Sequence, residues 1–143
     1  MENRHGLAMG EATTLATGTA ERDAGQAMMA PLARRGRTTL GADENYDTQE
    51  FVAAMRAMGV TAHVAQHKKG RRSAIHGRTT QHAGCAVSQV NRKRIEEVVG
   101  CGKEVGGMRR MRLAGLASVG WTFTLRVAAY KLVRLPKLVE AAA

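Results

Sequence analysis

The chain has 143 residues and a mass of 15.4 kDa, which is room for one modest domain. Apolar residues make up 44% of it, enough to form a core and too many for a wholly disordered chain, although only 3% are aromatic. Its two cysteines, Cys85 and Cys101, exclude a disulfide framework. Neither a signal peptide nor an apolar run of about 18 residues is present, which predicts a protein without a membrane segment.

The charge is strongly asymmetric along the chain. The formal net charge is +10 and the sequence pI about 10.6. Residues 1–66 hold six Lys/Arg against eight Asp/Glu, whereas residues 67–143 hold sixteen against four. The basic excess therefore belongs to the second half, which favours a polyanionic partner such as nucleic acid. An anionic membrane surface and a merely solvated basic surface are the alternatives.

The N-terminal third is predicted to alternate weak elements. Residues 6–15 are interpreted as a weak strand that Gly10 interrupts. Thr19 is expected to cap a helix that reaches Arg34 at most, and Pro31 should end or bend it.

Residues 38–66 carry the clearest pattern. Residues 38–43 are predicted to form a strand that leads into a loop, and residues 61–66 form the next strand. Between them, residues 47–50 read Asp-Thr-Gln-Glu, which is typical of a capping box. Phe51, Met55 and Met58 share one face of the helix that follows, and Gly59 ends it. This order predicts a βαβ unit with parallel strands and with Asp43 at the carboxyl end of the first.

The basic half is predicted to be a long loop followed by helices. Residues 67–87 begin with a basic run and are interpreted as a mobile basic loop. A helix is expected over 88–105, with Ile95, Val98, Gly102 and Val105 on its inner face, and Gly106-Gly107 should break the chain. The last helix is predicted over 116–134, before Pro136. Its expected inner face consists of Trp121, Leu125, Ala128 and Leu132.

Arg92, Glu96 and Lys103 are spaced to share one face of the helix predicted over 88–105. A carboxylate flanked by cations keeps its charge, which suits a metal ligand and equally suits an ordinary surface ion pair. With Asp43 at a strand end, the two carboxylates could share hard divalent cations that promote phosphodiester chemistry.

Several segments resemble bacterial insertion-sequence DDE transposases. Asp43-Glu44-Asn45-Tyr46-Asp47 resembles their Asp-Lys-Gly-Tyr-Asp signature, with Asn45 in place of its glycine. Counted from Glu96, Arg92 and Lys103 match their Tyr-x2-Arg-x3-Glu-x6-Lys signature, and Gln89 stands in place of the tyrosine. Residues 119–133 are similar to their closing helix.

This resemblance implies an α/β fold, a partial RNase H-like domain with an incomplete sheet, flanking helices and a long basic loop. It implies residues 6–66 as the partial sheet with helices, 67–87 as the basic loop and 88–135 as the C-terminal helices. Asp43 and Glu96 would be catalytic metal ligands for two Mg²⁺ ions, supported by Arg92 and Lys103. Transposon ends and target DNA would bind the basic side chains, which are Lys68, Lys69, Arg71, Arg72, Arg94, Arg109, Arg110 and Arg112.

The first catalytic aspartate of such a core has no good counterpart before Asp43, because Asp23 falls in the first turn of a predicted helix. We therefore expect a truncated C-terminal piece of the catalytic domain, inactive alone, at the bacterial nucleoid in the cytoplasm. Whether it forms a homodimer is left open. A non-catalytic basic nucleic-acid-binding protein is the alternative function, and a last helix lying on a membrane is a weaker one. Zinc at His63 and His67, or at His82 and Cys85, is a minor alternative, since no paired cysteine motif supports it.

Overall fold

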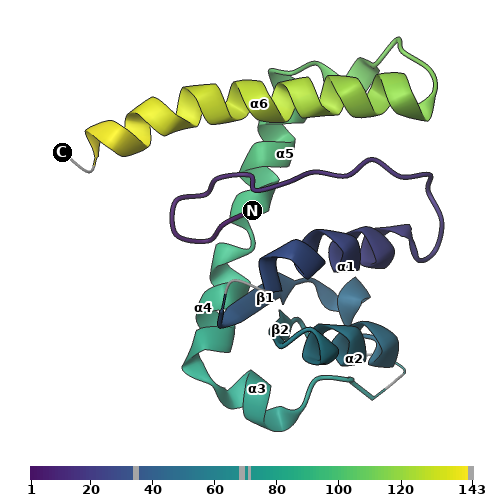
Figure 1. Cartoon of the computed structure of the whole chain (residues 1–143), viewed down its shortest axis with the longest axis vertical. Coiled ribbons are helices and arrows are strands. Elements are labelled where there is room, and N and C mark those ends of the chain that lie inside the picture. Colours follow the sequence, from purple (N-terminus) through teal and green to yellow (C-terminus); the bar gives the residue numbers. More distant parts are fainter. Residues whose placement is uncertain (34–35, 68–69, 71, 142–143) are drawn as a thin grey trace. The chain divides into compact units, whose positions relative to one another are not determined.

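The computed structural model describes residues 1–33, 36–67, 70 and 72–141 (Figure 1). Contacts along the chain divide it into two compact units. One unit consists of residues 17–92, and the other joins residues 1–16 to residues 93–143. The boundary between Arg92 and Lys93 falls inside the segment that was predicted to be a single helix.

The unit of residues 17–92 is a mixed helix-and-strand unit built around a two-stranded sheet. Its elements are α1 (Ala20–Ala33), β1 (Thr38–Ala42), the 3-10 turn η1 (Glu44–Tyr46), α2 (Gln49–Ala57), β2 (Val60–Val64), α3 (Gly77–Gln81) and α4 (Ala83–Asn91). The strands are parallel, with Thr38 opposite Val60 and Ala42 opposite Val64. The predicted βαβ unit of parallel strands is confirmed, and Figure 1 shows β1 and β2 side by side.

Local signals explain where α2 begins and ends. The Thr48 hydroxyl caps the helix by accepting a hydrogen bond from the Phe51 N–H at 3.3 Å. Gly59 follows the helix with φ +72°, the left-handed conformation that ends many helices. Phe51 and Met55 are fully buried between these two signals, as their spacing predicted.

The core of this unit lies between α2 and one face of the sheet. Phe51 contacts Tyr46 edge to face, with ring centroids 5.0 Å apart. The other buried members come from α1, α2, β2 and the segment before α3: Met29, Val52, Val60, Ala62, Val64 and Ile75. Burying a large apolar side chain completely stabilises a fold by roughly 1.5–3 kcal/mol. Phe51 and Met55 are fully buried, and they therefore form the centre of this core.

Two predictions for this unit need correction, and the predicted end of α1 lies within its stated limit. The hydroxyl at the start of α1 that accepts from the Ala20 N–H belongs to Thr17, not Thr19. Pro31 lies inside α1, which ends at Ala33, while Arg34 lies outside the described residues. The predicted loop 67–87 instead contains α3 and the start of α4.

The helices in that segment form because His76 and His82 cap them. The Nδ1 atoms of the two histidines accept hydrogen bonds from the backbone N–H groups of Arg78 and Gly84. Histidine is not among the usual capping residues, so the composition of the segment favoured a loop.

The unit that joins residues 1–16 to residues 93–143 is helical in its C-terminal part. Its elements are α5 (Arg94–Glu104), the 3-10 turn η2 (Met108–Arg110) and α6 (Leu116–Glu140). Ala8, Val98 and Val127 form its buried apolar cluster, with Met1, Phe123 and Tyr130 packed around them. Residues 6–15 cover α5 and α6 as an irregular segment rather than the predicted strand, and the Tyr130 hydroxyl donates to the Gly6 carbonyl at 3.2 Å.

The predicted inner face of α6 is wrong, and that of α5 is confirmed only at Val98. Trp121 and Leu132 on α6 are 66% and 72% exposed, and Val105 at the end of α5 is 85% exposed. The face of α6 that packs is instead the one carrying Phe123, Val127 and Tyr130. The helix also continues past Pro136 to Glu140, and Gly107, with φ +64°, breaks the chain after α5 as expected.

Candidate functional site

Asp43 immediately follows β1, at the carboxyl end of the parallel pair. Its side chain caps η1 by accepting a hydrogen bond from the Asn45 N–H at 2.9 Å. The residue is half-buried. Functional groups in open parallel sheets gather at this edge, so Asp43 occupies the position that the sequence predicted for it.

Helix α4 brings two further motif residues to the same edge of the sheet. The Gln89 amide nitrogen donates to the Ala42 carbonyl at 3.2 Å and also to the carbonyl of His63, and thereby bridges β1 and β2 near their ends. Its amide oxygen accepts from Arg92 Nε at 2.8 Å. Gln89 stands where the resemblance expects a tyrosine, and it holds the side chain of Arg92 beside the strand ends.

The close approach of α4 to the sheet depends on Gly41. A Cβ atom at this position would lie 3.1 Å from the Ser88 carbonyl oxygen and 3.6 Å from the Arg92 Cβ. A larger side chain on β1 would therefore push α4, and Arg92 with it, away from the strand that leads to Asp43.

Asp47 is the residue of this site that the sequence analysis misinterpreted. It is 1% exposed and does not cap α2. Its Oδ2 accepts from the His67 N–H and its Oδ1 from the Ala74 N–H, each at 2.8 Å. Asp47 thus fastens the segment that leaves β2 to the connection that leaves β1, next to Asp43. A buried carboxylate that accepts hydrogen bonds from backbone N–H groups holds the backbone in position. Only the place of Asp47 in the matched signature could have indicated this role from the sequence.

Glu96 and Lys103 lie in the other unit. Glu96 is in the first turn of α5, Lys103 is in the last, and both are exposed. Arg92 instead ends α4, because the predicted single helix is two helices with a turn at residues 92–93. The expectation that these three residues share one helix face is therefore wrong. Since Asp43 and Glu96 belong to different units, the meeting of their carboxyl groups stays a prediction.

The predicted DNA-binding side chains differ in their exposure and in whether they bond to other residues of the chain. Arg94 donates to the Asn3 carbonyl at 2.9 Å and also to that of Arg4, and Arg109 pairs with Glu104. The described members of the set that are exposed are Arg72, Arg109, Arg110 and Arg112. Lys68, Lys69 and Arg71 lie outside the described residues.

The described residues do not themselves form a group of metal ligands. Among the residues that the structure describes, no three His, Cys, Asp or Glu side chains are grouped as metal ligands. His63 Nδ1 is 2.7 Å from Ser88 Oγ, and burial, assisted by the nearby His82, lowers its pKa. Burial raises the pKa of the Cys85 thiol, which disfavours the thiolate that zinc binds. We accordingly derive no chemical step through a metal ion.

No helix in the described part of the chain is long and apolar enough to cross a membrane.

Comparisons with protein-family models, curated protein sequences and solved structures find no match to this chain.

Proposed function

We propose that this chain is part of a DDE transposase catalytic domain that binds DNA and does not cleave it alone. The observation that carries the proposal is the edge of the sheet where Asp43 follows β1 and Gln89 holds Arg92. These are residues that the transposase signatures assign to one site, and a parallel βαβ unit is compatible with part of an RNase H-like sheet.

The exposed arginines account for DNA binding in this proposal. Arg72 lies in the segment between β2 and α3, Arg110 is the last residue of η2, and Arg112 follows η2. Cations that neutralise backbone phosphates release counterions, so binding should weaken steeply with salt. Charge reversal of Arg110 is expected to reduce the slope of log affinity against log salt by about 1 or more.

The decisive experiment asks whether Asp43 and Glu96 share divalent cations. Mn²⁺ is titrated into the full chain, and the amide signals near each residue are followed by NMR for paramagnetic broadening. A shared site predicts that both regions broaden together and that Asp43→Asn abolishes both effects. Glu97→Gln is the matched control, since Glu97 is the exposed neighbour of Glu96 and is expected to leave the broadening unchanged. Independent broadening of the two regions would contradict a shared site.

A second candidate function, DNA binding without metal chemistry, is favoured by the lack of a grouped ligand set among the described residues. It predicts no Mn²⁺ effect near Asp43, the same DNA affinity for Asp43→Ala as for the unaltered chain, and weakened binding when Arg72 and Arg110 are reversed. Metal-dependent cleavage of transposon-end DNA by the isolated chain would contradict both functions.

A further inference from the structure

A hollow of about 450 Å³ lies on the other side of the sheet from α2. Thr39, Thr61 and His63 point to this side, because they alternate along the strands with the core residues Leu40, Ala62 and Val64. Ser88 on helix α4 contacts His63, so the helix covers the part of this face near His63. The uncovered part, toward the amino ends of the strands, is the hollow.

The residues that line the hollow have the charge and the hydrogen-bond donors that suit an anion. Its cations are Arg37, which precedes β1, and Arg78 on α3, and both are exposed. Hydroxyl groups of Thr39, Thr61 and Thr79 line it as well. Among the described residues that line it, none is acidic. Guanidinium groups match the oxygens of a phosphate in pairs, and threonine hydroxyls supply further donors.

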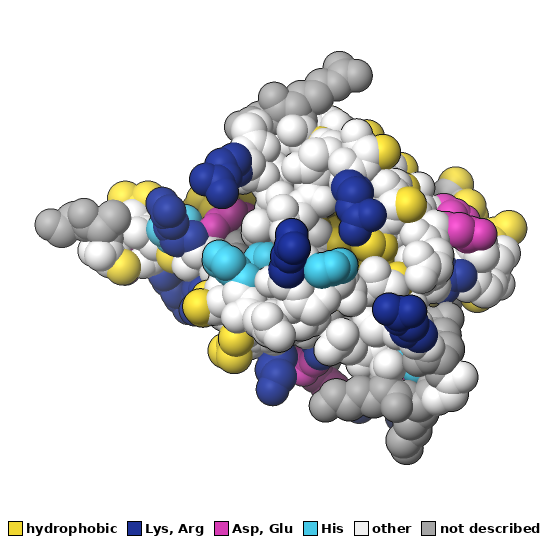
Figure 2. All heavy atoms as spheres, turned by 90° about the horizontal axis from the view of Figure 1, so that it is seen from below, with side chains coloured by type: hydrophobic (Ala, Val, Ile, Leu, Met, Phe, Trp, Pro, Cys, Tyr) yellow, Lys and Arg dark blue, Asp and Glu magenta, His cyan; other side chains and the backbone are white. Residues whose placement is uncertain are grey.

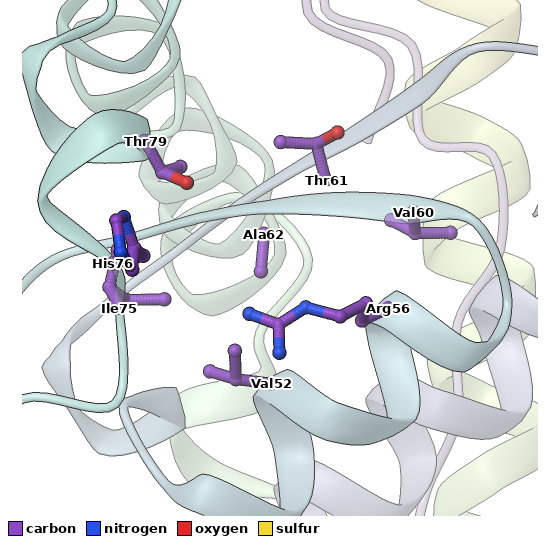
Figure 3. Close-up of a pocket in the computed structure, with 8 residues that line it drawn as sticks. All are labelled: Val52, Arg56, Val60, Thr61, Ala62, Ile75, His76 and Thr79. Atoms are coloured by element: carbon purple, nitrogen blue, oxygen red, sulfur yellow. The ribbon is translucent and has the colours of Figure 1, made fainter.

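A smaller pocket of about 130 Å³ shares Thr61 and Thr79 with the hollow and adds a third cation. Figure 3 shows the Arg56 guanidinium extending among the lining residues of this pocket, between Ala62 and Val52 in this view. The two pockets meet at Thr61 on β2 and Thr79 on α3, and we refer to them together as the groove along β2. Figure 2, which views the molecule from the side of α3, shows basic and histidine side chains gathered on one surface.

The lining also limits what the groove can recognise. No Phe, Tyr or Trp borders either pocket, so the groove offers no platform on which a base could stack. At neutral pH His63 is uncharged, because burial lowers its pKa, and the positive charge comes from the arginines. The chemistry is that of a phosphate group rather than of a nucleobase.

We propose that the groove along β2 binds a phosphate group between Arg37 and Arg78. It lies toward the amino ends of the strands, whereas Asp43 follows the carboxyl end of β1, so it is separate from the candidate site above. The phosphate can belong to a small phosphorylated molecule or to a nucleic-acid backbone, which share this chemistry. The proposal does not depend on the transposase assignment.

The experiment uses the full chain and follows amide signals by NMR. Three probes are titrated in turn: inorganic phosphate, thymidine 5′-monophosphate and a single-stranded thymidine decanucleotide. The amides of Thr39, Thr61 and Thr79 are expected to shift with at least one probe. Arg78→Gln should weaken that binding about tenfold, since a charge-assisted donor is lost. Arg37→Gln provides a second variant if Arg78→Gln does not fold.

The matched control is Lys137→Gln, which removes the same charge from an exposed position on α6 in the other unit. It is expected to leave binding at the groove unchanged. Binding of the decanucleotide well above that of the two small probes would assign the phosphate to a nucleic acid, and similar affinities would assign it to a small molecule. Unshifted groove amides with all three probes, or equal losses in the variants and the control, would overturn the proposal. Because Mn²⁺ broadening near Asp43 is a separate readout, its failure leaves this test intact.

Discussion

Replacing Asp47 by alanine removes both oxygen atoms that hold the segment after β2. The two N–H groups that lose their acceptor belong to His67 and Ala74. Hydrogen bonds to a charged acceptor contribute about 1.5–3 kcal/mol each, so complete loss of both corresponds to roughly 3–6 kcal/mol. His67 and Ala74 are only half-buried, and water can replace part of what is lost. We expect Asp47→Ala to destabilise the unit of residues 17–92 by about 3 kcal/mol.

Two further variants make this prediction sharper. Asp47→Asn keeps one acceptor and turns an amide donor toward the other N–H group, so it should cost about half as much as alanine. Asp43→Ala removes a single local bond from the half-buried end of β1 and should cost less than about 1 kcal/mol. The expected order of destabilisation is Asp47→Ala, then Asp47→Asn, then Asp43→Ala.

Native-state hydrogen exchange measures the effect where it arises. The amide protons of His67 and Ala74 should exchange about a hundredfold faster in Asp47→Ala, in line with the free energy lost. Urea unfolding followed by far-UV circular dichroism gives the corresponding stability. Unchanged exchange at both amides, together with a stability within about 0.5 kcal/mol of the original, would refute the account of Asp47 as the fastening residue.

Three further predictions concern the same unit, and one of them takes a glycine on α5 in the other unit as its comparison. Because burial lowers the pKa of His63, the unfolded chain binds a proton there first, so stability should fall as the pH decreases below about 6.5 and level off below the folded-state pKa. His63→Gln should remove this pH dependence in urea unfolding at pH 7 and pH 5, and an equal pH dependence in both proteins would contradict it. Gly41→Val should lower the free energy of unfolding by about 1–3 kcal/mol, because the new Cβ would lie 3.1 Å from the Ser88 carbonyl oxygen. In comparison, the Cβ added by Gly100→Ala meets nothing within 4 Å, and this substitution should stabilise α5 by about 0.5–1 kcal/mol. Phe51→Ala should cost about 3–5 kcal/mol in thermal unfolding, and a cost below about 1 kcal/mol would show that Phe51 is not the centre of the core.

The candidate site could be predicted in part because its signals are local. Asp43 directly follows a short strand, and a strand end is recognisable from the residues on either side of it. The role of Gln89 could not be predicted, since its partners Ala42 and His63 are 47 and 26 residues away in sequence. The same holds for Asp47, whose local context suggested a helix cap while its acceptors serve a distant segment.

The βαβ core was determined by the sequence itself: the Thr48 cap, the spacing of Phe51 and Met55, and Gly59 each act within a few residues of the backbone they control. The tertiary structure alone decided which face of α6 is buried and where the helix predicted over 88–105 divides. Those outcomes depend on contacts between residues that are far apart in sequence, such as Tyr130 and Gly6. A local sequence pattern carries no information on the free energy of such contacts. An apolar stripe such as that of Trp121 and Leu132 predicts a buried face only when the fold supplies something to cover it.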